Sequence, residues 1–439
     1  MLERATAAGA LLALTVLIGT PQNVEAQQAP ATTNQPGGSQ SAAPGSPPAT
    51  LDDQLEAGDD ELATPQRNLV KWNHYDGKFF AIRAGAGFLY EYAAFSQDEA
   101  SEEQLQLFPT PKVRDARFLF KGHFKFNRPV SWSTGIMYDV PTKSFLVRET
   151  GVMIGVPEIS GSIFVGRSKE GFSLNKIMVG YAGWTMERTP ISDATIPILA
   201  DGVKWLGYAP EKHLLWNLGA FTDVLSEGQT FSTYDHQFVG RLVWLPVENN
   251  ETVLHLGADV RYGKPNDGTL RLRSKPEAFP APYFIDTGAF PAQSSRTTSF
   301  EAYYRPGPLL LGAEYFLQQV NAPEKGDPFF QGGNAMVSWL ATGETRAYNT
   351  RGGFFNQISP ARPVFQGGPG AWELVANFSY ADLNSGPVQG GKFWRFTPMV
   401  NWHLSDNMRL ELTYGYGSLN RFGLIGATQF FQTRLQLQL

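Results

Sequence analysis

The segment Phe431-Gln432-Thr433-Arg434-Leu435-Gln436-Leu437-Gln438-Leu439 decides the fold class of this 439-residue chain. Its odd-numbered positions are mostly apolar, and its even-numbered positions are polar. Successive side chains of a β-strand point to opposite faces of the sheet, so this segment has one apolar face and one polar face. A chain that ends within such a strand favours a transmembrane β-barrel over a soluble sandwich.

The two preceding segments repeat this alternation. Residues 394–404 and 408–416 carry mostly apolar side chains at even positions and mostly polar ones at odd positions, and a short Ser405-Asp406-Asn407 turn joins them. Aromatic residues gather near the ends of membrane-spanning strands, where they form interfacial girdles. The residues expected in such girdles are Trp394, Trp402, Tyr414 and Tyr416.

Alternation interrupted by Gly, Pro, Asn and Asp predicts sixteen strands after residue 76. The expected fold class is therefore all-β, a 16-stranded antiparallel transmembrane β-barrel with inward-folded loops. The expected strands are 77–92, 113–127, 130–140, 145–155, 160–168, 202–209, 213–223, 235–246, 252–262, 297–305, 309–320, 328–341, 371–382, 391–404, 407–418 and 428–439.

Both ends of the barrel are expected on the periplasmic side, since the number of strands is even. The tight turns at 127–129, 209–212, 305–308 and 405–407 then lie on this side as well. Three connections are too long to be turns: 169–201 and 263–296, which parity makes extracellular, and 342–370, which it makes periplasmic. A barrel of this size leaves an aqueous channel, and we expect long loops to fold inward and constrict it.

The region before the barrel differs in composition. The apolar run 7–18, followed by Val24-Glu25-Ala26, predicts a signal peptide over residues 1–26. Together with the predicted barrel, it indicates a bacterial outer-membrane location. Residues 27–76, rich in Gln, Pro and Ser and then acidic, are expected to be a disordered periplasmic linker before the barrel at 77–439. Residues 1–76 hold nine acids and three bases, so the net charge of -5 comes from this tail, and 32 acids and 33 bases remain for the barrel.

No apolar run after the signal peptide is long enough for a membrane helix. The chain also has no cysteine, although disulfides are permitted outside the inner membrane, so its stability must come from packing and strand closure.

Alternation gives the barrel a lumen with more bases than acids. The basic residues expected there are Arg83, Arg117, Lys121, Lys125, Arg241, Arg261, Arg305, Arg395, Arg409 and Arg434, and the acidic ones are Asp115, Asp259, Glu301, Glu373 and Glu411. Positive charge in a confined passage concentrates anions and repels cations. The competing interpretation is that charged residues face inward only because lipid excludes them, and that paired Arg and Glu brace the wall.

A second basic cluster, Arg271, Arg273 and Lys275, lies in an expected extracellular loop. It can equally be a solvated loop or a contact with lipopolysaccharide.

Several stretches are more specific than this periodicity. They are Ser338-Trp339-Leu340-Ala341-Thr342-Gly343-Glu344, Arg346-Ala347-Tyr348, Pro360 to Pro363, Gly370-Ala371-Trp372-Glu373-Leu374, Asp382-Leu383-Asn384, Gly390-Gly391 and Asn401-Trp402. Together they resemble the phosphate-selective porin O/P family over about residues 77–439. Upstream, residues 166–174, followed by Met186-Glu187-Arg188, resemble the start of that family's inward-folded third loop.

This resemblance implies a homotrimeric porin in which arginines and lysines guide phosphate-like anions past a narrow waist. It makes Arg167 and Lys169 candidates at the approach to the waist and places Arg117 in a strand similar to the family's basic second strand. Residues 113–117 depart from the consecutive arginines usual in that strand, and Leu439 replaces the usual terminal Phe. The anion-pathway candidates are therefore Arg117, Lys121, Lys125, Arg167, Lys169, Arg241, Arg261, Arg395, Arg409 and Arg434.

The expected partners are small inorganic anions, outer-membrane lipid and lipopolysaccharide, without nucleic acid, metal or cofactor. Three other functions stay open. An enzyme would have to use His255 near Asp259, or His123, although the chain lacks a metal-ligand spacing such as His-Glu-x-x-His. A structural or adhesive barrel would use the N-terminal tail as an anchor. A porin for organic anions or uncharged small solutes would differ only in lacking phosphate selectivity.

Overall fold

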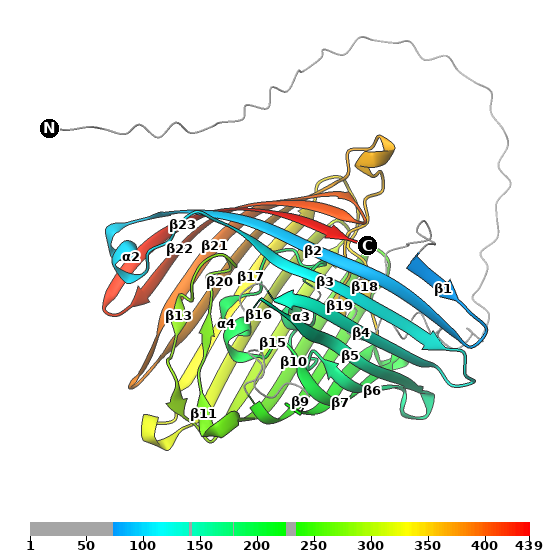
Figure 1. Ribbon diagram of the computed structural model, residues 1–439, viewed down its shortest axis with the longest axis horizontal. Helices are drawn as coiled ribbons and strands as arrows, with labels where there is room; N and C mark the ends of the chain where they lie inside the picture. Colours follow the sequence, from blue (N-terminus) through cyan, green and yellow to red (C-terminus); the bar gives the residue numbers. More distant parts are fainter. Residues whose placement is uncertain (1–72, 140–142, 179, 225–233) are drawn as a thin grey trace, which may run out of the picture. The chain divides into compact units, whose positions relative to one another are not determined.

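The computed structural model describes residues 73–139, 143–178, 180–224 and 234–439; the predicted signal peptide and nearly all of the predicted linker lie outside these ranges. Their main feature is a 17-stranded sheet, in which β1 (His74–Asp76) is a short addition to β2 and the other strands form a ring (Figure 1). The ring closes between β2 and β23, whose ladder runs from Gly87–Gln438 to Gln97–Thr428. The expected 16-stranded antiparallel barrel is thus confirmed.

The strands of the ring follow one another along the chain, each antiparallel to the next. They are β2 (Phe80–Gln97), β3 (Thr110–Phe124), β4 (Val130–Asp139), β5 (Ser144–Val156), β6 (Gly161–Ser168), β7 (Ala200–Ala209), β8 (Leu214–Thr222), β9 (Tyr234–Glu248), β10 (Thr252–Pro265), β15 (Ser294–Pro306), β16 (Leu309–Asn321), β17 (Phe329–Leu340), β20 (Ala371–Ser385), β21 (Val388–Ser405), β22 (Met408–Arg421) and β23 (Leu424–Gln438).

The remaining elements are short and lie in the connections. The helices are α2 (Glu99–Gln104), α3 (Leu174–Ile177) and α4 (Pro190–Thr195), with 3-10 turns η2 (Pro157–Ile159), η3 (Pro210–Lys212), η4 (Asn266–Gly268), η5 (Pro323–Lys325) and η6 (Val364–Gln366). The small strand pairs are β11 (Thr269–Leu270) with β14 (Phe290–Pro291), β12 (Arg273–Ser274) with β13 (Ile285–Asp286), and β18 (Tyr348–Asn349) with β19 (Phe354–Phe355). Within the described ranges, no helix is long and apolar enough to cross a membrane.

Every predicted strand overlaps one strand of the ring. The largest differences are at the C-terminal end of β2 and the N-terminal end of β23, and β21 and β22 also extend further than expected. These extensions contain Gly, Ser and Asn, which alternation treats as turn residues, yet their ladders continue, for example through Asn420 opposite Ile425. Backbone pairing with a neighbouring strand therefore outweighs local composition there.

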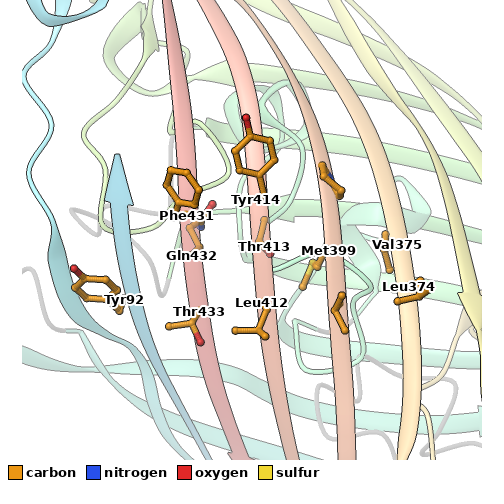
Figure 2. A pocket seen from close by; sticks show the side chains of 12 residues that line it. Tyr92, Leu374, Val375, Met399, Leu412, Thr413, Tyr414, Phe431, Gln432 and Thr433 are labelled. Carbon is orange, nitrogen blue, oxygen red and sulfur yellow. The ribbon is translucent and has the colours of Figure 1, made fainter. Parts of the chain in front are cut away.

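The two faces of the strands are as predicted. On β22 and β23, Tyr414 and Phe431 are exposed on the outside, whereas Glu411 and Arg434 are buried inside. Trp372 and Trp402 stack on the outside with ring centroids 4.9 Å apart. A shallow apolar groove crosses this outer face from β20 to β23 and is lined by Leu374, Leu412, Tyr414 and Phe431, among others (Figure 2).

The long connections fold into the barrel, as expected. Because short turns mark the periplasmic end of such barrels, we assign the end that carries β1 and Leu439 to the periplasm and two of the three segments to the extracellular side. We name them inner loop 1 (residues 169–199), inner loop 2 (residues 266–293) and the periplasmic inner segment (residues 341–370). Their buried side chains include Trp184, Phe284 and Phe355, respectively.

Two apolar clusters attach these segments to the part of the wall that runs from β7 to β23. One joins Phe172 and Ile191 of inner loop 1 and Phe284 of inner loop 2 to wall residues such as Phe316 and Phe430. The other joins Trp184 and Phe355 to wall residues from β8 to β21. Strands β3 to β6, which the structure describes in full, contribute no residue to either cluster. Some lumen-facing side chains of that wall, including Lys121 and Ser133, stay partly exposed, whereas others, such as Arg117 and Arg148, are buried by other contacts.

Candidate ion pathway through the barrel

A β-bulge in β3 changes which residues face the lumen. In the β2–β3 ladder Leu89 pairs with Asp115 and Tyr90 with Val113, so Arg114 is an extra residue. Such a bulge reverses the alternation on one side of it. Arg114 therefore joins Asp115 on the inner face, although strict alternation had left it out of the predicted lumen set.

The bulge gives β3 a run of lumen-facing bases. We call Lys112, Arg114, Arg117 and Lys121 the β3 basic face. Arg117 donates to Asp115 with a distance of 2.9 Å between Nε and Oδ1, and its guanidinium lies 5.1 Å from the centre of the Tyr181 ring of inner loop 1. Lys121 is half-buried and lies opposite the equally half-buried Arg83 of β2.

Arg114 connects β3 to inner loop 1. Its guanidinium donates to both carboxylate oxygens of Glu187, at 2.7 and 3.1 Å. Glu187 also pairs with Arg434 of β23. Burial acts to raise the pKa of the Glu187 carboxyl, but the charges and hydrogen bonds of Arg114 and Arg434 outweigh it and lower this pKa to about 2. Glu187 is therefore ionised at neutral pH and bridges two strands of the wall.

Inner loop 2 brings further positive charge to the β3 basic face. The Lys275 ammonium lies 4.5 Å and the Arg114 guanidinium 4.6 Å from the centre of the Phe279 ring, and Lys112 lies 5.7 Å from it. Burial, with the nearby charge of Lys112 and Arg114, lowers the pKa of Lys275 to about 8. Three cations thus surround one aromatic ring, which attracts them through its electron-rich faces.

The predicted extracellular cluster of bases is divided in the structure. Lys275 points towards β3, whereas Arg271 forms an exposed ion pair with Asp286 at 2.5 Å, and Arg273 lies over Tyr283 at 4.2 Å. Of these three residues, only Lys275 lies next to the β3 basic face.

A second bulge lies two strands away, in β5. Thr134 pairs with Thr150 and Ile136 with Val147, so Arg148 and Glu149 share the bulge, and both are buried on the inner face. Arg148 pairs with Glu149 at 3.0 Å. Arg167, predicted at the approach to the waist, donates to the carbonyl of Val147, next to this bulge, at 2.9 Å and to Asp201 at 2.7 Å.

Five predicted pathway residues hold the inner segments. Arg241 pairs with Glu301 and donates to the Gly353 carbonyl, at 2.7 and 2.8 Å. Arg261 pairs with Glu170 at 2.6 Å, and Arg395 donates to the Pro276 carbonyl at 2.6 Å. The other two are Arg409, which donates to the Gly183 carbonyl at 2.7 Å, and Arg434, which donates to the Met186 carbonyl.

The two remaining candidates, Lys169 and Lys125, differ in burial. Lys169 is buried and donates to the carbonyls of Ile177 and Met178 at the C-terminus of α3, at 3.3 and 3.4 Å. Lys125 lies just beyond β3 at the periplasmic rim, where its ammonium is exposed and pairs with Asp76 at 2.6 Å. The structure thus groups Arg117 and Lys121 with Arg114 and separates them from the other candidates.

Inner loop 1 is fixed through its own backbone. Four consecutive carbonyls accept hydrogen bonds from side chains of the barrel and of the periplasmic inner segment, so an irregular chain satisfies its polar groups inside the barrel. The pairs are Tyr181 with Gln436, Ala182 with Arg346, Gly183 with Arg409, and Trp184 with Asn401. Alternation could place Gln436 and Asn401 on the inner face, but it could not identify these partners.

The wall also carries buried acids that the predicted set lacks: Glu91, Glu149, Asp201 and Glu314. Several of them pair with arginines, as Glu91 does with Arg434 and Asp201 with Arg167. These acids therefore offset part of the positive charge in the predicted lumen set.

His255 is occupied by structural contacts. Its two ring nitrogens lie 2.6 Å from the Tyr348 hydroxyl and 2.7 Å from Glu301, and the residue is fully buried. Neither ring nitrogen of His255 faces a space that a substrate could enter. This geometry therefore does not favour an enzyme that uses His255.

Comparisons with known proteins agree with this architecture. Curated relatives include an uncharacterized protein of Caulobacter vibrioides, 32% identical over 180 residues (40% of this chain, 36% of the relative), and Porin O of Pseudomonas aeruginosa, 22% identical over 208 residues (40% and 47%). The chain thus matches less than half the length of either relative. The anion-selective porin from Comamonas acidovorans shares the fold, with a TM-score of 0.53 and 11% identity over 82% of this chain and 100% of that chain.

The family assignment rests on the sequence profile of the phosphate-selective porins O and P, which matches residues 82–439. This range includes every strand of the ring except the first two residues of β2. Porins are channels, and outer-membrane porins share this barrel. The chain therefore belongs to the phosphate-selective porin O and P family.

Proposed function

We propose that this protein is a porin that passes small anions, in particular phosphate-like oxyanions, along the β3 basic face. The observation that carries the proposal is the bulge that turns Arg114 inward beside Lys112, so that four bases and Asp115 line one strand. Partly exposed cations in a narrow passage raise the local anion concentration. Arginine also presents two parallel donors, which suit phosphate and carboxylate oxygens.

The proposed passage follows those bases of β2 and β3 that stay partly exposed in the lumen. Arg114 keeps about a quarter of its side-chain surface exposed, and Lys121 and Arg83 are half-buried. By contrast, Arg241, Arg395 and Arg434 are almost fully buried in contacts with acids or loop carbonyls. We assign the first group to the ion pathway and the second group to anchoring.

Planar-bilayer recordings test this proposal. Under a KCl gradient, the reversal potential of the native protein should show preference for chloride, and millimolar phosphate should reduce the chloride current. Cation preference would contradict the role of the β3 basic face. Anion current unaffected by phosphate would contradict phosphate preference alone.

The alternative substrate class is organic anions. The Phe279 ring among Lys112, Arg114 and Lys275 favours it, since an aromatic carboxylate could meet both the ring and the cations. Competition of chloride current by benzoate and by phosphate, at equal concentration and buffered pH, separates the two classes. Stronger block by benzoate would favour organic anions.

We also propose that the protein is a homotrimer exported by a cleaved signal peptide and in contact with lipopolysaccharide. A trimer form is known for the OmpT outer-membrane protein of Vibrio cholerae, which shares the fold with a TM-score of 0.52. Exposed Arg271 and half-buried Arg273 of inner loop 2 support contact with lipopolysaccharide phosphates. Light scattering of the detergent-solubilised protein and N-terminal sequencing of the mature chain test the first two points.

A further inference from the structure

Two segments that fold into the barrel from opposite sides of the membrane meet at Arg346. This residue belongs to the periplasmic inner segment and is almost fully buried. Its Nη1 donates to the carbonyl of Ala182 in inner loop 1 at 2.7 Å and to the carbonyl of Asn356 in its own segment at 2.9 Å. Its Nη2 donates to Glu373 on β20 at 2.6 Å. One guanidinium therefore joins both segments to the wall.

The acceptor on the wall is itself held from several strands. Glu373 accepts hydrogen bonds from Ser338 of β17 at 2.5 Å and from Asn401 and His403 of β21 at 3.0 and 3.1 Å. Asn401 also donates to the carbonyl of Trp184, so this network reaches inner loop 1 a second time. Glu373 is fully buried, and a buried carboxylate needs such partners to remain charged.

Apolar packing surrounds this hydrogen-bonded centre. The Trp184 ring of inner loop 1 lies 6.4 Å from the Phe355 ring of the periplasmic inner segment and 5.5 Å from the Tyr303 ring of β15. The Arg346 guanidinium lies 5.9 Å from the Trp184 ring. The two segments thus form one packed unit against the wall.

We propose that Arg346 is a positioning residue that locks inner loop 1 to the periplasmic inner segment and thereby confines conduction to the β3 side of the lumen. It lies apart from the proposed passage and acts through the segments that it joins. A lysine at this position could pair with Glu373, but a single ammonium lacks the two-nitrogen fork that reaches Ala182 and Glu373 together. This proposal rests on the proposed anion pathway. The contact between the two segments can nevertheless be measured without measuring ion selectivity.

The lock is tested with a charge-matched double variant, Arg346→Met with Glu373→Gln, because removing Arg346 alone would leave a buried carboxylate unpaired. The native chain has no cysteine, so a thiol introduced by Ala182→Cys reports on this junction alone. Ala182 is 1% exposed. Reaction of this thiol with a small charged methanethiosulfonate should be about tenfold faster or more in the double variant, the change expected when a charge-assisted hydrogen bond no longer holds a segment closed.

Conductance provides the second measurement. The double variant should show a larger single-channel conductance and faster swelling of liposomes in oligosaccharide solutions than the native protein, since a second part of the lumen opens. Arg346→Lys should give intermediate values in both experiments. A thiol introduced by Ala93→Cys on β2, which is equally buried, should stay unreactive in all backgrounds.

Unchanged labelling and conductance in the folded double variant would overturn the lock. Native behaviour of Arg346→Lys would overturn the requirement for the guanidinium fork. If recordings of the native protein show cation preference while Ala182→Cys labelling still depends on Arg346, the proposed anion pathway fails and the lock stands.

Discussion

Arg114 and Glu187 form a two-point ion pair, at 2.7 and 3.1 Å, that links the bulge of β3 to inner loop 1. The pair is only partly buried, with side-chain exposures of 26% and 17%. It is therefore placed both to line a passage and to hold the loop beside it.

Arg114→Gln should reduce anion preference. The variant removes one positive charge. The carboxylate of Glu187, which loses this partner, then offsets part of the positive charge of the remaining bases. A unit charge about 8 Å from an ion contributes about 0.5 kcal/mol in water, so the chloride-to-potassium permeability ratio should fall at least about two- to threefold. The reversal potential under a KCl gradient measures this ratio, and an unchanged value would remove Arg114 from the pathway.

Lys121→Gln and Lys125→Gln form a matched pair, since Lys121 lies on β3 and Lys125 directly follows its end. Lys121 is half-buried on the β3 basic face, whereas Lys125 pairs with Asp76 at the exposed rim. We expect Lys121→Gln to lower anion preference about twofold and Lys125→Gln to change it little, because charge at the rim is screened by salt. Equal effects of the two variants would contradict this placement of the passage.

Anion preference should decrease as the pH rises through about 8. Burial lowers the pKa of Lys275 from 10.5 to about 8, so this lysine is charged below that pH and neutral above it. Reversal potentials between pH 6.5 and 9.5 should show the step, and Lys275→Arg should remove it because arginine stays charged. A step that persists in Lys275→Arg would shift the assignment to Lys176, whose pKa burial also lowers to about 8.

Arg434→Met should destabilise the barrel. Arg434 is buried, pairs with Glu91 at 2.5 Å and also holds Glu187. Removing one partner of a buried ion pair costs about 3–5 kcal/mol, because the other charge is left without compensation. The barrel should unfold at lower temperature in gel-shift assays, and Arg434→Met with Glu91→Gln should recover part of the loss. Native stability of the single variant would show that this ion pair does not support the fold.

Much of the fold follows from short-range alternation. Lipid admits apolar side chains, and the backbone must pair with neighbouring strands, so period-two segments such as 431–439 predict a closed barrel and the face of each residue. The same pattern placed Arg117, Arg241 and Arg434 on the inner face, where the structure has them. It omitted Arg114, because a bulge depends on how two strands align and leaves little trace in one sequence.

The roles of the inward residues could not be predicted in this way. Arg346 bonds to Ala182, 164 residues away, and Arg409 bonds to Gly183, 226 residues away. Such contacts exist only after the inner segments have packed inside the barrel. Alternation indicates that an arginine faces the lumen, but it does not indicate whether a carboxylate, a loop carbonyl or water will meet it there.

Side-chain alternation against lipid is enough to predict an all-β membrane barrel with sixteen strands and three long connections. Which lumen-facing bases anchor the inner segments, and which stay partly exposed along β3, becomes visible only in the folded protein, because a buried charge must be paired. Its partners here come from distant segments of the chain, and only the folded arrangement brings them together.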